Sequence, residues 1–157
     1  MFDSPETLET IFSVCGALAM VGWIGLVLLP LSPLVVDTLA RLVIPALIGV
    51  VYLTLMAANI GLVPENGGFG SLAQVQQLFS VDALLLGGWV HYLAFDLFVG
   101  AWEVRDARNR NIHHLLVVPC LLATFMAGPA GLLLYLVVRS ITAAINPENT
   151  ATAGVTT

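Results

Sequence analysis

The sequence predicts an all-α integral membrane protein, a bundle of four transmembrane helices. Three observations predict it. Hydrophobic residues make up 59% and charged residues 10% of the 157 residues, whereas soluble domains have about 45–50% apolar and about 25% charged residues. The basic residues are five arginines, without a lysine. Four apolar stretches reach the roughly 20 residues that a helix needs to cross about 30 Å of hydrocarbon. We expect one transmembrane domain over residues 1–145 and a short, disordered C-terminal tail over 146–157.

The first predicted span runs from about Leu8 to Leu31. Ser4 and Pro5 are typical of a helix start, and the segment between Pro30 and Pro33 is expected to end the span. The flank before this span carries acidic residues and no cation. Signal peptides have a basic flank, so we do not expect cleavage here.

The second predicted span runs from about Thr38 to Leu62, with Asp37 as its N-terminal cap. The next stretch, residues 63–70, holds a proline, an asparagine and three glycines. That density of turn formers predicts a loop, because such a sequence cannot form lipid-exposed helix. Residues from Ser71 to Phe79 are expected to form a short helix at the membrane interface.

The third predicted span covers about Val81 to Trp102, and the fourth covers about Ile112 to Arg139. The fourth contains Pro119 and the pair Gly128-Pro129. Proline removes a helix hydrogen bond and clashes with the preceding turn. We therefore expect the fourth helix to be bent or broken near Pro129.

The arginines predict the orientation in the membrane. Four of them fall in the two loops on one side of the predicted bundle, and Arg139 lies toward the other side. Cytoplasmic loops carry an excess of basic residues. The two loops are therefore expected in the cytoplasm and both termini outside it.

Ionisable residues at membrane depth are the main functional signal, because a charge there costs at least about 2.5–3.5 kcal/mol. In the third span, residues at intervals of seven form one polar face: Asp82, Trp89, Asp96 and Glu103. Tyr92 lies one turn before Asp96 on this face. We expect Asp96, the deepest, to be functional or structurally paired, and Glu103 to be solvated or paired at the end of the span.

A second face of the third span is mostly aromatic, formed by His91, Phe95, Phe98 and Trp102. Such a stripe is often core packing, but rigid aromatic walls also suit a conjugated polyene. His91 fits either an interhelical hydrogen bond or a reactive group. On the second span Arg41, Tyr52 and Asn59 share a face. We expect these faces to point inward and enclose a narrow polar cavity.

The sequence predicts no metal site, cofactor or nucleic-acid partner. His113 and His114 are adjacent, so their side chains point about 100° apart and make poor joint ligands. Cys15 and Cys120 lie in predicted spans and form no metal-binding pattern. No basic patch suggests nucleic-acid binding.

Many residues of the third and fourth spans together match a known pattern: His91 to Gly100, Trp102, Asp106, Ile112, His114, Pro119-Cys120, Thr124 to Met126, Gly128 to Gly131 and Leu132 to Tyr135. In these residues the chain resembles the abscisic-acid-deficient-four-like family, whose plant members are associated with neoxanthin synthesis. The likeness covers about half the chain closely. Nothing resembling a plastid transit peptide precedes the first span, so we expect a bacterial member in an inner or photosynthetic membrane.

The resemblance implies an isomerase acting on a carotenoid. Neoxanthin forms from violaxanthin when an acid protonates the epoxide oxygen and a base removes a vinylic proton, which needs no redox cofactor. Asp96 suits the acid, and His91 or His114 suits the base. We expect substrate contacts from further residues of the inward faces, namely Trp89, Tyr92, Phe95, Asn59 and Tyr52.

Two other functions remain open. The first is a non-enzymatic accessory subunit that holds pigment, quinone or lipid beside a membrane complex, such as a photosynthetic one. The second is a proton or ion pathway along the Asp96 face, which ranks last because the four spans show no internal repeat. Expected partners are membrane lipid, a carotenoid or other isoprenoid, and a membrane complex or a second copy of the chain.

Overall fold

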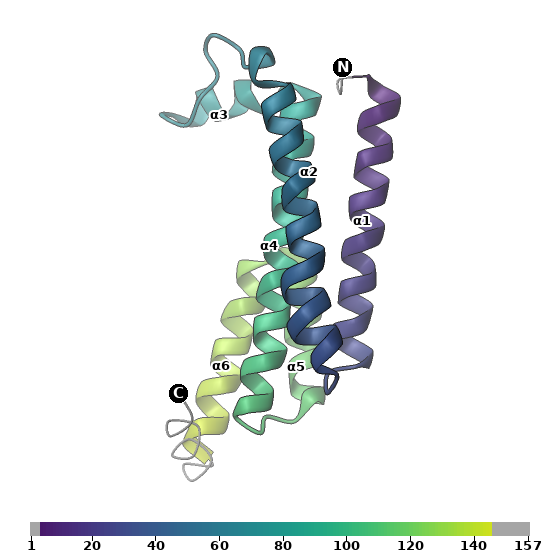
Figure 1. The fold of residues 1–157 in the computed structure, drawn as a ribbon. Helices are drawn as coiled ribbons and strands as arrows, with labels where there is room; N and C mark the ends of the chain where they lie inside the picture. The colour runs from purple at the N-terminus through teal and green to yellow at the C-terminus, as the bar shows by residue number, and fades with distance from the viewer. Residues whose placement is uncertain (1–3, 146–157) are drawn as a thin grey trace. The chain divides into compact units, whose positions relative to one another are not determined.

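The computed structural model describes residues 4–145, and the regular elements of this part of the chain are all helices, without strands (Figure 1). The predicted C-terminal tail lies outside the described residues. The chain divides into two compact units. Unit 1 comprises Met1–Met20 and Ile44–Phe95, and unit 2 comprises Val21–Val43 and Asp96–Thr157. We describe the two units separately.

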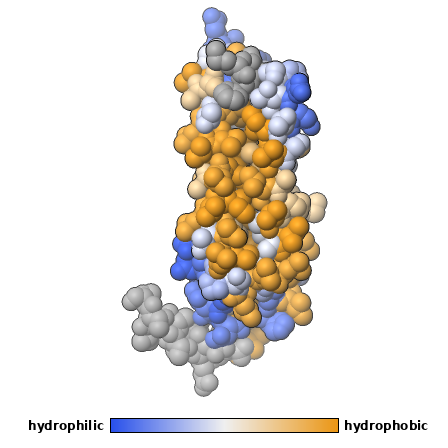
Figure 2. Space-filling model, turned by 45° about the vertical axis from the view of Figure 1, so that its right-hand side comes forward, coloured by the Kyte–Doolittle hydropathy of each residue, from blue (hydrophilic) through white to orange (hydrophobic). Residues whose placement is uncertain are grey.

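Within residues 4–145, three helical segments are long and apolar enough to cross a membrane: α1 (Pro5–Leu28), the continuous segment Leu34–Ala58, and α4 (Asp82–Asn109). They correspond to the first three predicted spans, which are confirmed as apolar helices. Hydrophobic side chains cover most of the helix surface visible in Figure 2. Most residues of the first two segments and half of those in α4 are not buried within the protein, which leaves their apolar side chains to face lipid.

The second span begins earlier than predicted and in a different conformation. Its first ten residues form a π-helix, η1 (Leu34–Val43), which continues into α2 (Ile44–Ala58). Pro45 has no N–H to continue the regular hydrogen-bond ladder, which favours a wider turn just before it. Asp37 therefore lies inside the helix, and its predicted role as a cap is wrong.

Between α2 and α4, unit 1 contains a short 3-10 turn, η2 (Ile60–Leu62), a loop, and the helix α3 (Leu72–Leu78). The Ser71 hydroxyl accepts a hydrogen bond from the Gln74 N–H at 3.3 Å and so caps α3. The predicted short helix in this region is confirmed. In Figure 1 this segment leaves the end of α2 sideways before the chain enters α4.

The helix α4 extends seven residues beyond the predicted end at Trp102, to Asn109. The added residues include one Glu, one Ala and two Arg, which are good helix formers. Asn111, with a φ of 55°, then turns the chain back, as residues in this left-handed conformation commonly do after a helix. The extension makes Glu103 part of a helix interior rather than of a loop.

The predicted break near Pro129 is confirmed, but the region does not form one long fourth helix. It forms α5 (His114–Ala127) and α6 (Pro129–Ile145), of 14 and 17 residues, each shorter than the roughly 20 residues of a span. Gly128 reverses the chain with a φ of 31°, and Pro129 suits the first position of α6. The two helices lie against one another as a hairpin (Figure 1).

Close packing of this hairpin requires Gly131. A Cβ atom at Gly131 would collide with the backbone nitrogen and hydroxyl of Thr124. The pair Gly128-Pro129 therefore correctly predicts a break in the helix. The return of α6 along α5 depends on the contact of Gly131 with Thr124, which the sequence pattern does not reveal.

Because of the hairpin, Arg139 does not lie where the sequence predicts it. Its Nε lies 3.2 Å from Oδ2 of Asp106, near the end of α4. The prediction that Arg139 lies toward the opposite side from the other arginines is therefore wrong. The physical reason is that α6 runs back instead of continuing the direction of α5.

Candidate functional site

Unit 1 contains an apolar groove with a volume of about 580 Å³, which we call the His91 groove. Its walls come from α2, η2, the loop that follows, α3 and the first turns of α4. The lining residues are Tyr52, Leu53, Met56, Ala57, Ile60, Val63, Phe69, Leu78, Phe79, Leu84, Gly88 and His91. A groove with apolar walls and few polar groups is the usual form of a site for a small apolar ligand.

The polar side chains of the His91 groove are Tyr52 and His91. Their ring centroids are 5.7 Å apart, and the His91 ring stacks on Phe95 at 4.4 Å. His91 is exposed and Tyr52 is half-buried. The groove therefore presents an imidazole and a phenol side by side on an otherwise apolar surface.

Two glycines of α4 make room for this groove. A Cβ at Gly87 would collide with Cε of Met56, and a Cβ at Gly88 would lie 2.9 Å from Cε1 of Phe79. Without side chains at these positions, Met56 and Phe79 approach the α4 backbone closely. These two wall residues were missed in the sequence, where the glycine pair was the only available signal.

The predicted substrate-binding residues of unit 1 divide between two faces of α4. Tyr52 lines the His91 groove, and Phe95 stacks on His91. Trp89 instead stacks on Phe12 at 5.8 Å and on Tyr92 at 5.4 Å. These aromatic rings belong to a different surface from the groove.

Asn59 does not line the His91 groove. It is buried, with 3% of its surface exposed, and its side-chain Nδ2 donates to the Leu55 carbonyl at 2.9 Å. This bond pairs the Asn59 side chain with a backbone carbonyl in the last turn of α2. The contact gives Asn59 a structural role at a helix end.

Unit 2 contains a buried acidic residue that the sequence analysis placed at the end of a span. Glu103 is fully buried, and its Oε1 accepts a hydrogen bond from the Thr124 hydroxyl at 2.9 Å. Its Oε2 has no hydrogen-bond partner among the described residues. The expectation that solvent or surface pairing accounts for Glu103 is wrong, because α4 continues past it and α5 covers it.

The carboxylate of Asp96 lies against the break between α5 and α6. A Cβ at Gly128 would lie 2.8 Å from Oδ1 and 3.1 Å from Oδ2 of Asp96. Asp96 is half-buried. We call Asp96, Glu103, Thr124 and Gly128 the acidic cluster of unit 2.

The structure does not bring His114 to Asp96. His114 begins α5, and its Nε2 lies 3.0 Å from the carbonyl oxygen of Val27. Asp96 lies at Gly128, beyond the other end of this 14-residue helix, which is about 20 Å away at 1.5 Å per residue. His91 and Asp96 belong to different units, so the pairing of these two remains a prediction.

His113 acts at the same helix end, where its Nδ1 accepts a hydrogen bond from the Leu115 N–H at 3.4 Å. It therefore caps α5. Within residues 4–145 no group of three His, Cys, Asp or Glu side chains has an arrangement that could hold a metal ion.

The end of unit 2 at which α4 finishes carries a network of ion pairs, which we call the arginine end. Asp37 accepts from Arg108 at 2.7 Å and lies 3.5 Å from Arg105. Asp106 pairs with Arg110 at 2.9 Å and accepts a hydrogen bond from the Tyr135 hydroxyl at 2.7 Å. These contacts fix η1, α4 and α6 to one another and leave little reason to assign them a chemical role.

Comparison with known proteins agrees with this picture only at the level of the family. Neither the comparison with curated proteins nor that with solved structures gives a match. A family model described as ABA DEFICIENT 4-like matches residues 10–135. This range includes most of α1, all of η1 and α2, both walls of the His91 groove and the acidic cluster. The chain therefore belongs to the ABA DEFICIENT 4-like family.

Proposed function

We propose that this protein binds a carotenoid or a related isoprenoid in the His91 groove and isomerises or otherwise modifies its end group by acid–base chemistry. The observation that carries the proposal is the imidazole of His91 beside the phenol of Tyr52 in an apolar groove of about 580 Å³. Family membership supports a neoxanthin-synthase-like protein.

The groove suits an end group rather than a whole polyene. The apolar walls of the groove contact the apolar surface of an end group, and they offer no polar groups that would be left without a hydrogen bond. The exposed imidazole of His91 is available to whatever enters. Carotenoid end groups are bulky and apolar with one or two oxygen atoms, which matches a pocket with two polar side chains.

In the proposed reaction an acid delivers a proton to the epoxide oxygen, and the C–O bond breaks. A base removes the vinylic proton, and its electron pair forms the new double bond of the allene. One proton enters and one leaves, so no net oxidation occurs. The His91 imidazole accepts the proton, and the Tyr52 hydroxyl donates a hydrogen bond to the substrate oxygen.

Asp96 remains our proposed proton donor on chemical grounds, since a half-buried carboxylic acid within an apolar helix is a suitable general acid. The experiment below therefore treats it separately from the groove residues. The predicted alternative base, His114, is left out of the proposed reaction, because its Nε2 lies 3.0 Å from the carbonyl oxygen of Val27, a contact that predicts a structural role.

The test is pigment analysis in a bacterial host that makes an epoxy carotenoid, with and without this protein. We expect a new allenic carotenoid with unchanged mass. His91→Gln should remove at least nine-tenths of the product while the purified protein still carries pigment. Tyr52→Phe should reduce the product less, because it removes a hydrogen bond and not the base. Asp96→Asn should abolish product if Asp96 is the donor.

The matched control is His113→Gln, which removes an exposed imidazole from unit 2 and should leave the product unchanged. Gly88→Leu should exclude pigment, because its side chain would enter the space between α4 and Phe79.

Full conversion by His91→Gln would contradict the acid–base proposal. Bound pigment of unaltered identity in the unmodified protein would instead favour the second candidate, an accessory subunit that holds pigment or lipid for a membrane complex.

We also propose an orientation in the membrane, which we expect to be a bacterial inner or photosynthetic membrane. All five arginines of the chain belong to unit 2, and Arg139 pairs with Asp106 at the arginine end. The positive-inside rule then places the arginine end in the cytoplasm. With three spans and a hairpin, the N-terminus is outside and the end of α6 is inside. This proposal replaces the expectation that both termini lie outside.

A further inference from the structure

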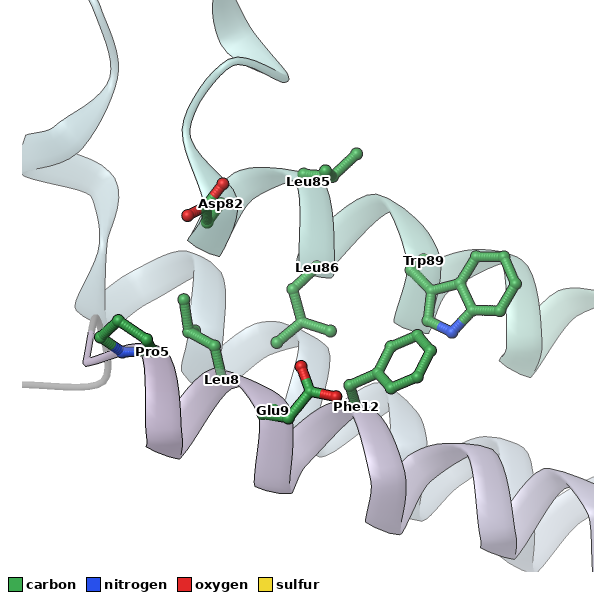
Figure 3. Close-up of a pocket in the computed structure, with 8 residues that line it drawn as sticks. All are labelled: Pro5, Leu8, Glu9, Phe12, Asp82, Leu85, Leu86 and Trp89. Atoms are coloured by element: carbon green, nitrogen blue, oxygen red, sulfur yellow. The ribbon is translucent and has the colours of Figure 1, made fainter.

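A second pocket of unit 1 lies between the first turns of α1 and α4 and has a volume of about 430 Å³. Its lining residues are Pro5, Leu8, Glu9, Phe12, Asp82, Leu85, Leu86 and Trp89. Figure 3 shows Glu9 and Phe12 rising from α1 toward Leu86 and Trp89 of α4, with Asp82 at the start of α4. None of its lining residues belongs to the His91 groove.

This pocket combines an acidic entrance with an aromatic wall. Glu9 and Asp82 are exposed, and neither forms an ion pair with any residue from 4 to 145. Phe12 stacks on Trp89 at 5.8 Å, and Trp89 stacks on Tyr92 at 5.4 Å. Phe12 and Trp89 are both partly exposed, so their rings offer apolar surface that a lipid chain can cover.

The charged residues of unit 1 as a whole also favour a cationic ligand. Residues 1–20 and 44–95 contain no lysine or arginine, and their acidic residues are Asp3, Glu6, Glu9, Glu65 and Asp82. An anionic head group would therefore find no lysine or arginine in this unit, whereas a cation finds two carboxylates that form no ion pair among residues 4–145. Charge complementarity of this kind selects the ligand.

We propose that this pocket binds the ammonium group of an ethanolamine phospholipid. The ammonium group lies between Glu9 and Asp82, where its three N–H groups donate to carboxylate oxygens. The upper part of an acyl chain covers Phe12 and Trp89, and the phosphate remains in water, away from the carboxylates. Choline carries the same charge but has no N–H to donate, so it should bind more weakly.

The ordinary alternative is that Glu9 and Asp82 are acidic residues near helix N-termini, where they interact favourably with the helix dipole. Asp82 is the first residue of α4, and Glu9 lies in the second turn of α1. That role predicts an effect on helix stability and none on the choice of lipid head group. The experiment must therefore measure lipid preference.

The experiment reconstitutes the full chain in nanodiscs containing a small fraction of phospholipid brominated on its acyl chains, which quenches nearby tryptophan fluorescence. Three head groups are compared: ethanolamine, choline and glycerol. The contribution of Trp89 is the difference between the protein and its Trp89→Phe variant. We expect the ethanolamine lipid to half-quench this contribution at a mole fraction at least threefold lower than the glycerol lipid, with choline between them.

The double variant Glu9→Gln/Asp82→Asn should lose the preference, so that all three lipids quench alike. Its control is Glu6→Gln/Glu65→Gln, which removes two charges from exposed positions of unit 1 outside the pocket and should keep the preference. Equal quenching by the three lipids in the unmodified protein would overturn the proposal. Equal loss in both double variants would also overturn it, because general charge would then suffice. The unmodified protein decides the question even if a variant fails to fold.

Discussion

The hydroxyl of Thr124 donates a hydrogen bond to Oε1 of Glu103 over 2.9 Å, and neither residue is exposed. This bond joins the last turn of α5 to the interior of α4 at a point where no solvent is available. A buried polar group without a partner is costly. The pair therefore helps to hold the α5–α6 hairpin in its position within unit 2.

The first prediction concerns the energy of this bond. Thr124→Val keeps the shape of the side chain and removes the donor, while Glu103→Leu removes the acceptor. A double-mutant cycle should give a coupling of about 0.6 kcal/mol and no more than about 1.7 kcal/mol, the average and the maximum measured for hydrogen bonds between transmembrane helices. Unfolding by dodecyl sulfate in mixed micelles measures it.

The control for this cycle is Thr54→Val. The Thr54 hydroxyl donates to the Val50 carbonyl at 2.9 Å within its own helix and is exposed, so the change should stay within about 0.5 kcal/mol. A coupling of zero between Thr124 and Glu103 would show that the two residues do not share a bond in the membrane.

The second prediction concerns the contact of α5 with α6. Gly131→Ala should lower the free energy of unfolding by at least about 2 kcal/mol, because the new methyl group overlaps Thr124 and forces the helices apart. Gly49→Ala is its matched control, since nothing lies within 4 Å of a Cβ at that helical position. It should be neutral or stabilising by up to about 1 kcal/mol from helix propensity. Similar results for both variants would contradict the hairpin packing.

The third prediction concerns Asp106 at the arginine end. Asp106→Asn keeps an oxygen for the Tyr135 hydroxyl but removes the charge that pairs with Arg110 at 2.9 Å and Arg139 at 3.2 Å. We expect a loss of about 1–2 kcal/mol, less than for a fully buried pair, because solvent screens these partly exposed groups. The loss should shrink in high salt. Glu65→Gln, on an exposed loop, should show neither effect.

The apolar spans were predictable because membrane crossing imposes one simple requirement, a continuous apolar stretch of sufficient length. The break at Gly128-Pro129 was predictable for a similarly local reason, the missing hydrogen bond and the restricted backbone of proline. The direction taken after the break was not. It depends on Gly131 meeting Thr124, a contact between residues whose spacing carries no periodic signal.

The candidate site was predictable by residue type and less so by grouping. His91 and Tyr52 share a groove, but this groove is apolar and His91 is exposed, whereas the helix faces predicted a narrow polar cavity. Met56 and Phe79 complete the walls of the groove only because Gly87 and Gly88 admit them. The expectation that Glu103 is solvated at the end of a span is wrong because a sequence leaves helix ends uncertain by several residues. An α4 that ended at Trp102 would have left Glu103 in water.

The last prediction separates three spans from four. After replacement of the two buried cysteines by alanine, single cysteines are introduced by Ser4→Cys, Asn109→Cys and Ile145→Cys. A maleimide that cannot cross membranes is added to intact cells and to permeabilised ones. Because Arg139 pairs with Asp106 near the end of α4, the end of α6 should share the side of Asn109. We expect the reagent to modify Ser4→Cys in intact cells and the other two only after permeabilisation. Modification of Ile145→Cys in intact cells, together with protection of Asn109→Cys, would mean that the last segment crosses the membrane.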